Sequence, residues 1–146
     1  MQNLLKIGQL KQHPPDGAEI GRLLAAAQRN LADARVTAIS PETRFDAAYK
    51  SIMQAALAAL MAHGYRPDTN KPGHHVTTVQ TLPLTIGLAA ARVTVLDTLR
   101  RKRNLSDYTG EDIDDSSAGH CIEEAERLLG EITAWLTANR SELNIG

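Results

Sequence analysis

The sequence predicts an all-α fold, a bundle of four main helices, and three observations support this prediction. The hydrophobic share is 42% and the aromatic share only 3%, so Leu, Ile, Val, Met and Ala must build the core. Segments rich in Ala and Leu, without long β-branched runs, favour helix over strand. Apolar residues recur at helical spacing in four stretches, and none shows the alternation of a half-buried strand. The length of 146 residues suits one domain.

The chain divides into three parts. We expect the helical bundle to span residues 16–140, after an N-terminal extension of residues 1–15 and before a frayed C-terminus of residues 141–146. The His13-Pro14-Pro15 stretch stops any regular element in the extension, because proline has no N–H to donate. Three apolar residues of the extension are candidates to pack against the bundle: Leu4, Leu5 and Ile7.

The first two helices have recognisable start signals. Asp16 is the expected N-cap of the first helix, with Glu19 three residues later, which is a variant of the capping box. Ser40 is expected to cap the second helix, with Pro41 at the first helical position, where its missing N–H costs nothing. Gly64 is well placed to end this helix in a left-handed cap.

The last two helices follow a loop over residues 65–75 that is rich in proline and glycine. The third helix should run from about residue 76 to about residue 104, with a break near Pro83. Asp115 or Ser116 is expected to cap the fourth helix. Its apolar stripe comprises Ile122, Ala125, Leu129, Ile132 and Leu136. Four amphipathic helices joined by mostly short loops form a bundle.

The composition excludes several classes of function. A net charge of -1 gives no overall attraction to nucleic acid or membrane, so any basic site must be local. The single cysteine, Cys121, excludes an internal disulfide and a zinc site built from a cysteine cluster. We find no signal-peptide layout and no apolar run long enough to span a bilayer. The sequence therefore predicts a cytoplasmic protein with no membrane partner.

The densest cluster of positive charge closes the third predicted helix. One explanation is that cations complement the macrodipole and the free carbonyl groups at a helix C-terminus. The other is a contact with phosphate, since an Arg guanidinium binds phosphate in a bidentate manner. We expect a surface ion pair between Asp97 and the start of the cluster. The cluster, a candidate nucleic-acid-binding site, comprises Arg100, Arg101, Lys102 and Arg103.

Other candidate residues have simpler explanations. The adjacent His74 and His75 can ligate a metal ion, but no further ligand stands at metal-binding spacing. We therefore expect no metal site, and expect these imidazoles to cap the third helix or bond to neighbouring loops. Cys121 lies beside the apolar stripe of the fourth helix and should be a buried, inert thiol. The sequence shows no glycine-rich phosphate loop and no serine nucleophile elbow.

Four segments, taken in order, resemble the HEPN (higher eukaryotes and prokaryotes nucleotide-binding) domain family. They are RFDAAY at residues 44–49, GYR at 64–66, GHH at 73–75 and LRRKRNLSDY at 99–108. The resemblance covers the middle two helices and the loop between them. It implies a small helical bundle, often a homodimer, in which the third helix borders a cleft. It also implies no cofactor.

Active members of the family are metal-independent ribonucleases, whose motif is an Arg, usually followed by Asn, with a His four to six residues after the Arg. Arg103 and Asn104 match the Arg-Asn pair, and Tyr108 stands at one possible position of the His. If Arg101 is the motif Arg, Ser106 falls there instead. Neither side chain exchanges a proton near neutral pH as an imidazole does. We therefore expect phosphate binding with slow or absent cleavage.

Three functions remain open from the sequence. The first is an HEPN-like module that binds RNA or a nucleotide within a toxin–antitoxin or defence system, with a minimal nucleotidyltransferase as a partner. The second is a metal-independent endoribonuclease in which Tyr108 replaces the His, with Arg103 and Asn104 as the other catalytic residues. The third is a structural helical bundle whose basic cluster docks another protein.

Overall fold

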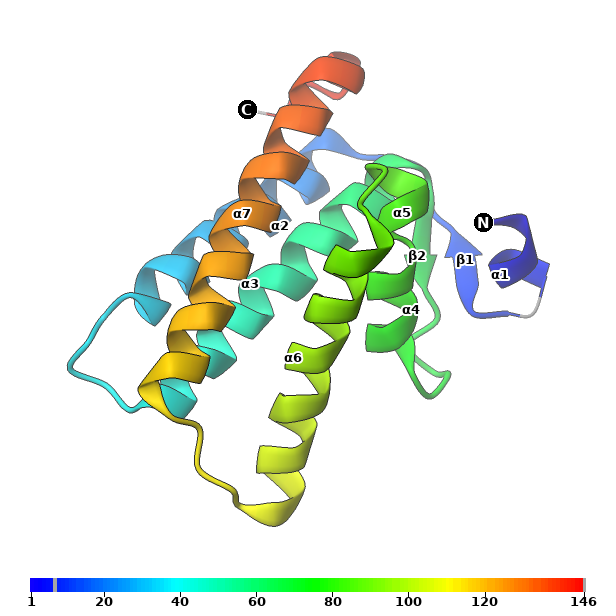
Figure 1. Cartoon of the computed structure of the whole chain (residues 1–146). Helices are drawn as coiled ribbons and strands as arrows, with labels where there is room; N and C mark the ends of the chain where they lie inside the picture. Colours follow the sequence, from blue (N-terminus) through cyan, green and yellow to red (C-terminus); the bar gives the residue numbers. More distant parts are fainter. Residues whose placement is uncertain (7, 146) are drawn as a thin grey trace.

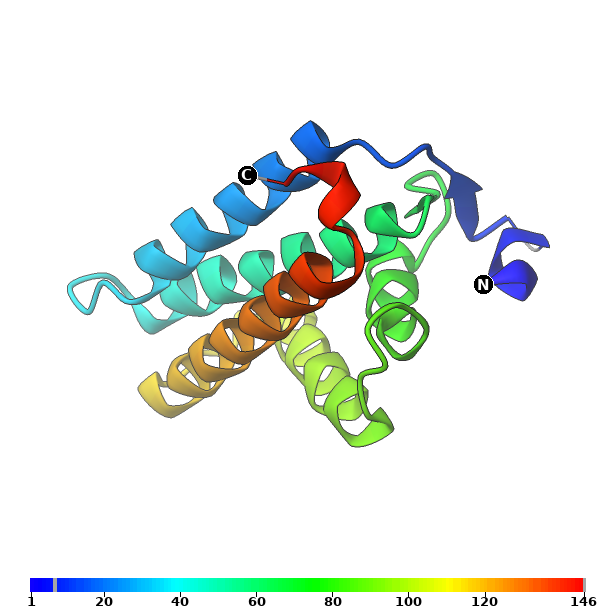
Figure 2. The same ribbon diagram turned by 90° about the horizontal axis from the view of Figure 1, so that it is seen from above.

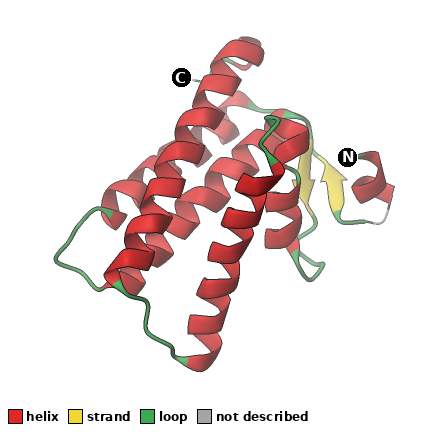
Figure 3. Ribbon diagram, viewed as in Figure 1, coloured by secondary structure: helices red, strands yellow, loops and turns green. Residues whose placement is uncertain are grey.

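The computed structural model describes residues 1–6 and 8–145, so Ile7, a candidate for packing on the bundle, and Gly146 lie outside the described residues. Figure 1 shows the order of the elements and Figure 3 their type. In chain order they are α1 (Gln2–Lys6), β1 (Leu10–Gln12), α2 (Gly17–Ala34), α3 (Pro41–Ala62), β2 (Tyr65–Pro67), α4 (His74–Gln80), α5 (Leu82–Thr85), α6 (Ala90–Thr109), α7 (Asp115–Asn139) and the 3-10 turn η1 (Ser141–Leu143). The predicted all-α fold is confirmed, and the four main helices are α2, α3, α6 and α7.

Helix α3 is the central element of the core. It packs against α2 and α7, and also against α4, α5 and α6 (Figures 1 and 2). Its side chains Phe45 and Ile52 are almost completely buried. Alanines in its second half are fully buried and allow neighbouring helices to approach closely: Ala55, Ala56, Ala58, Ala59 and Ala62. The position of α3 decides which side chains of the surrounding helices come together.

The helix starts follow the predicted caps, with one difference. The side chain of Asp16 accepts a hydrogen bond from the N–H of Ala18, and that of Ser40 accepts one from the N–H of Thr43. The cap of α7 is Asp114, one residue before the predicted Asp115, and its carboxylate accepts from a backbone N–H at 2.8 Å. Each cap satisfies a backbone donor that the first helical turn leaves free.

The third predicted helix is divided into three. It begins at His74, two residues before the predicted start. It breaks around Pro83, as expected, giving the separate helices α4, α5 and α6. Gly87, with φ of 71°, provides a left-handed turn before α6. Helix α6 then ends at Thr109, five residues beyond the predicted end. It runs obliquely to α7 (Figure 2), and Arg92 joins the two helices through Glu131 at 2.8 Å.

The sequence analysis did not predict the short helix α1 or the two-stranded antiparallel ribbon β1–β2, whose second strand lies in the expected loop over residues 65–75. Leu10 lies opposite Pro67, and both are buried. Each strand has three residues, which is too short for alternation to be recognised. The ribbon brings the end of the N-terminal extension against the loop that follows α3 (Figure 3). It forms one wall of a surface hollow described below.

The segment expected to be frayed begins with η1, the 3-10 turn. Leu143 and Ile145 are partly buried against the core. The backbone carbonyl of Leu143 lies so close to Gly17 that any side chain on residue 17 would clash with it. Within the described residues, no helix combines the length and the apolar character needed to cross a membrane.

Candidate nucleic-acid interface

The side chain of Arg103 projects from α6 toward α3 and contacts two side chains there. Its Nε atom lies 3.4 Å from Oδ1 of Asp46, and its guanidinium carbon lies 4.9 Å from the centre of the Tyr49 ring. The second contact is a cation–π interaction, which fixes the plane of the guanidinium group. The Nε atom is buried and makes no hydrogen bond with the described residues. The Arg103 side chain is 31% exposed, so its two terminal nitrogens, and not the buried Nε, are the donors within reach of an anion.

Tyr49 connects Arg103 to an imidazole. The Tyr49 hydroxyl lies 3.0 Å from Nδ1 of His75, at the start of α4, which is within hydrogen-bonding distance. Burial raises the pKa of Tyr49 to about 12, against a smaller opposite effect of Arg103. Burial also lowers the pKa of His75, and the neighbouring His74, Arg103 and Arg100 act in the same direction. His75 is therefore neutral near pH 7, and the lowered pKa also makes it a weaker base than a free imidazole.

These residues line a groove of about 650 Å³ between α3, α4 and α6, which we call the Arg103 groove. The volume falls within the range of small-molecule sites. Its basic side chains are Lys50 and Arg103, and Asp46 is its acidic side chain. The other polar and aromatic residues of its lining are Asn30, Thr43, Tyr49, Gln54, Thr69, His74, His75 and Thr78.

The remaining cations of the predicted cluster point in different directions. Arg100 and Arg101 both pair with Asp97, at 2.9 Å and 3.0 Å, which is the expected surface ion pair. Arg100 faces the same side as Arg103, since both influence the pKa of Tyr49. Arg101 and Lys102 instead line a hollow on another face of α6. One phosphate therefore cannot contact all four cations.

The other two predicted site residues lie apart from Arg103. Asn104 is half-buried and does not line the Arg103 groove. Tyr108 is 90% exposed near the end of α6, so its hydroxyl is surrounded by solvent. The structure brings Arg103 together with Asp46, Tyr49 and His75, and not with Asn104 and Tyr108.

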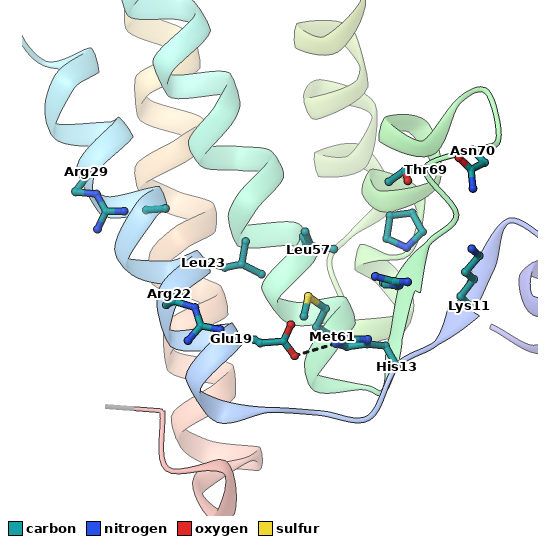
Figure 4. A pocket seen from close by; sticks show the side chains of 13 residues that line it. Lys11, His13, Glu19, Arg22, Leu23, Arg29, Leu57, Met61, Thr69 and Asn70 are labelled. Atoms are coloured by element: carbon teal, nitrogen blue, oxygen red, sulfur yellow. Dashed lines mark hydrogen bonds and ion pairs between the residues drawn. The ribbon is translucent and has the colours of Figure 1, made fainter.

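Two further hollows lie beside the Arg103 groove, along the face of α3 that carries Lys50, Leu57 and Met61. The ribbon hollow, of about 680 Å³, lies between the β1–β2 ribbon, α2 and α3 (Figure 4). The bridging hollow, of about 450 Å³, contains Lys50 and Arg29. Lys50 also lines the Arg103 groove, and Arg29 also lines the ribbon hollow. The three hollows are therefore neighbours that share lining residues.

The predicted role of the histidine pair is partly different in the structure. His75 bonds to the side chain of Tyr49 in α3 and does not cap its own helix. His13, in the N-terminal extension, lies 2.9 Å from Glu19 at the ribbon hollow. No group of three His, Cys, Asp or Glu side chains gathers closely enough for a metal ion anywhere in residues 1–6 and 8–145.

Sequence reasoning missed Asp46, Tyr49 and His75 as site residues. Tyr49 is 3% exposed and belongs to the core as well as to the groove. All three belong to segments that carry the HEPN resemblance, RFDAAY and GHH. That shared membership was the available signal. The contact itself depends on how α4 and α6 pack on α3, which a linear pattern does not specify.

Comparison with known proteins adds no further assignment. No protein-family model matches the chain, and no curated protein is similar to it at a significant level.

Proposed function

We propose that the chain is an HEPN-like module that binds RNA through its phosphate backbone at the Arg103 groove. The observation that carries this proposal is Arg103 itself, which lies over the Tyr49 ring and lines the groove with a side chain that is 31% exposed. A guanidinium held in one plane loses little further freedom on binding phosphate. Lys50 adds a second cation to the same groove. Nucleotide bases can stack on imidazole rings such as those of His74 and His75.

The HEPN resemblance supplies the proposed context. It includes a homodimer, a toxin–antitoxin or defence system and a minimal nucleotidyltransferase as a partner. The basic groove is compatible with this context because toxin activity on RNA begins with contacts to phosphate. The alternative of a purely structural bundle does not explain why a groove of this size lies beside Arg103.

A metal-independent ribonuclease is the second candidate, and His75 is the observation that favours it. Its neutral imidazole could take the proton of a ribose 2′-hydroxyl while that oxygen attacks the phosphorus. The 5′-oxygen would then leave with a proton from water, giving a 2′,3′-cyclic phosphate and a 5′-hydroxyl. Arg103 would stabilise the charge on the phosphate. In this variant of the second function, His75 replaces Tyr108 as the proton acceptor.

The test is a comparison of RNA binding by the wild-type chain, Arg103→Ala and Arg127→Ala. Arg127 is exposed on α7 and lines none of the three hollows, so it controls for the loss of one charge. We expect Arg103→Ala to weaken binding of a single-stranded RNA about tenfold and to lower the slope of log K against log salt by about 0.7. Arg127→Ala should change neither value. Equal binding and equal slopes in both variants would leave the structural bundle as the function.

Cleavage is measured in the same series with Tyr108→Phe and His75→Gln added. Slow or absent cleavage by the wild-type chain supports the binding module. Efficient cleavage without added metal ions, lost in His75→Gln and kept in Tyr108→Phe, would establish the ribonuclease with His75 as base. The opposite pattern would assign the proton transfer to Tyr108.

A further inference from the structure

The ribbon hollow is lined by four cations from three elements. Arg22 and Arg29 lie on α2, Lys11 on β1 and Arg66 on β2. Figure 4 shows Arg22 and Arg29 on one side of the hollow and Lys11 on the other, with Leu57 and Met61 of α3 between them. The basic walls match the positively charged track of a single-stranded nucleic-acid groove, and the floor between them is aliphatic.

Most of this positive charge is not neutralised by neighbouring carboxylates. Lys11 lies 3.7 Å from Asp68, but no ion pair of Arg22, Arg29 or Arg66 occurs within the described part of the chain. The one acidic side chain of the lining, Glu19, already contacts His13 at 2.9 Å. The hollow therefore attracts an anion, whereas structural arginines are normally paired.

The cations of the ribbon hollow continue those of the Arg103 groove. The two hollows share Leu57, Pro67 and Thr69, and the bridging hollow contributes Lys50 and Arg29 between them. The cations along these hollows include Arg103, Lys50, Arg29 and Arg22, and three carboxylates lie among them, those of Asp46, Asp33 and Glu19. A ligand with one phosphate can contact only one or two of these cations, whereas a chain of phosphates can contact several.

We propose that the ribbon hollow binds the phosphates of further nucleotides of the same single RNA strand that Arg103 holds. This inference rests on the proposed function. The apolar side chains of Leu23, Leu57 and Met61 offer a floor for unstacked bases. Sequence-independent contacts of this kind increase affinity with strand length until the groove is filled. The affinity of this surface should therefore depend on the length of the RNA strand more than on its nucleotide sequence.

The experiment measures binding of two single-stranded RNA probes, a dinucleotide and a strand of about ten nucleotides. The proteins are the wild-type chain, the Arg22→Ala/Arg29→Ala double variant, Arg103→Ala and the control Arg127→Ala. The two removed arginines are exposed, so we expect the double variant to fold, and a thermal melt confirms it. The wild-type chain should bind the longer strand more tightly than the dinucleotide.

The double variant should lose about tenfold or more in affinity for the long strand, with a salt slope lower by about 1.4 for two phosphate contacts. Its affinity for the dinucleotide should stay within about twofold of wild type, since Arg103 is intact. Arg103→Ala should weaken both probes. Unchanged long-strand binding in the double variant, while Arg103→Ala still weakens both probes, would overturn the extension alone. An equal loss for both probes in the double variant would also overturn it. If Arg103→Ala changes neither probe, the proposed function itself fails.

Discussion

Arg103 and Asp46 form an ion pair, with 3.4 Å between Nε and Oδ1, at the place where we propose that phosphate binds. The side chain of Asp46 is 54% exposed, so solvent screens the pair and its contribution to stability is small. The carboxylate nevertheless faces the same space as an incoming phosphate. Its negative charge therefore opposes RNA binding, while the Tyr49 ring keeps the guanidinium in position.

Replacing Asp46 with Asn should strengthen RNA binding. The substitution removes a like charge from the groove and keeps the shape of the side chain. A gain of about twofold to fivefold corresponds to an exposed charge interaction below 1 kcal/mol. Fluorescence anisotropy with a labelled RNA measures the affinity. Glu123→Gln, on the exposed face of α7, is the control for a lost negative charge. Weaker binding by Asp46→Asn would mean that the carboxylate positions Arg103 for its ligand.

The partial burial of His75 should make the stability depend on pH. Its pKa lies below the usual 6.5 in the folded chain, so the unfolded chain takes up a proton first as the pH falls. The free energy of unfolding should therefore decrease as the pH falls below about 6.5 and through the lower folded pKa. In His75→Gln this part of the decrease should disappear. Urea unfolding between about pH 5.5 and pH 8 measures it. The exposed His120 provides the control variant His120→Gln. The same pH dependence in His75→Gln and wild type would contradict the prediction.

Cys121 should resist alkylation in the native chain. Its side chain is fully buried, and its Sγ donates to the carbonyl of Phe45 at 3.7 Å. Burial raises the thiol pKa to about 12, so almost no thiolate exists at pH 8. Iodoacetamide, followed by mass spectrometry, should label Cys121 in urea and leave it unlabelled in buffer. Rapid complete labelling of the native chain would show that α7 opens readily or that the thiol is accessible.

The homodimer expected from the HEPN resemblance should bury the end of α6. Leu105 and Tyr108 are 50% and 90% exposed there, an unusual position for two large apolar or aromatic side chains. Light scattering at micromolar concentration should give about twice the chain mass of 15.8 kDa. Leu105→Arg should halve this mass, whereas Leu84→Arg, at an exposed leucine in α5, should not. A wild-type monomer would contradict the expectation.

The predicted parts of the fold were those that depend on local sequence. Ser40-Pro41 placed the start of α3 correctly, and Pro83 placed the break before α6, because caps and proline act within one turn. The β1–β2 ribbon pairs Leu10 with Pro67, and three-residue strands carry no local pattern. Partners so distant in sequence are specified by packing alone.

The candidate site likewise contains residues that a local pattern could identify and residues that only packing brings together. Arg103 was identified from the charge cluster, and the divergence of Arg100 to Arg103 around α6 follows from helical periodicity. His75 lies on another helix and reaches the groove only because α4 packs on α3. A motif search along one helix could not find an imidazole supplied by a different one.

The β1–β2 ribbon also bears on the order in which the binding surface is assembled. Strand β1 precedes α2 and α3, and strand β2 follows them, so their pairing closes a loop that contains both helices. Closing a long loop costs entropy that only later contacts repay, whereas the α2–α3 pair forms from near neighbours. We expect the helices to associate first and the ribbon to close over them last. The ribbon amides should accordingly exchange their hydrogens faster than those of α3, and the proposed RNA-binding surface is complete only in the fully folded chain.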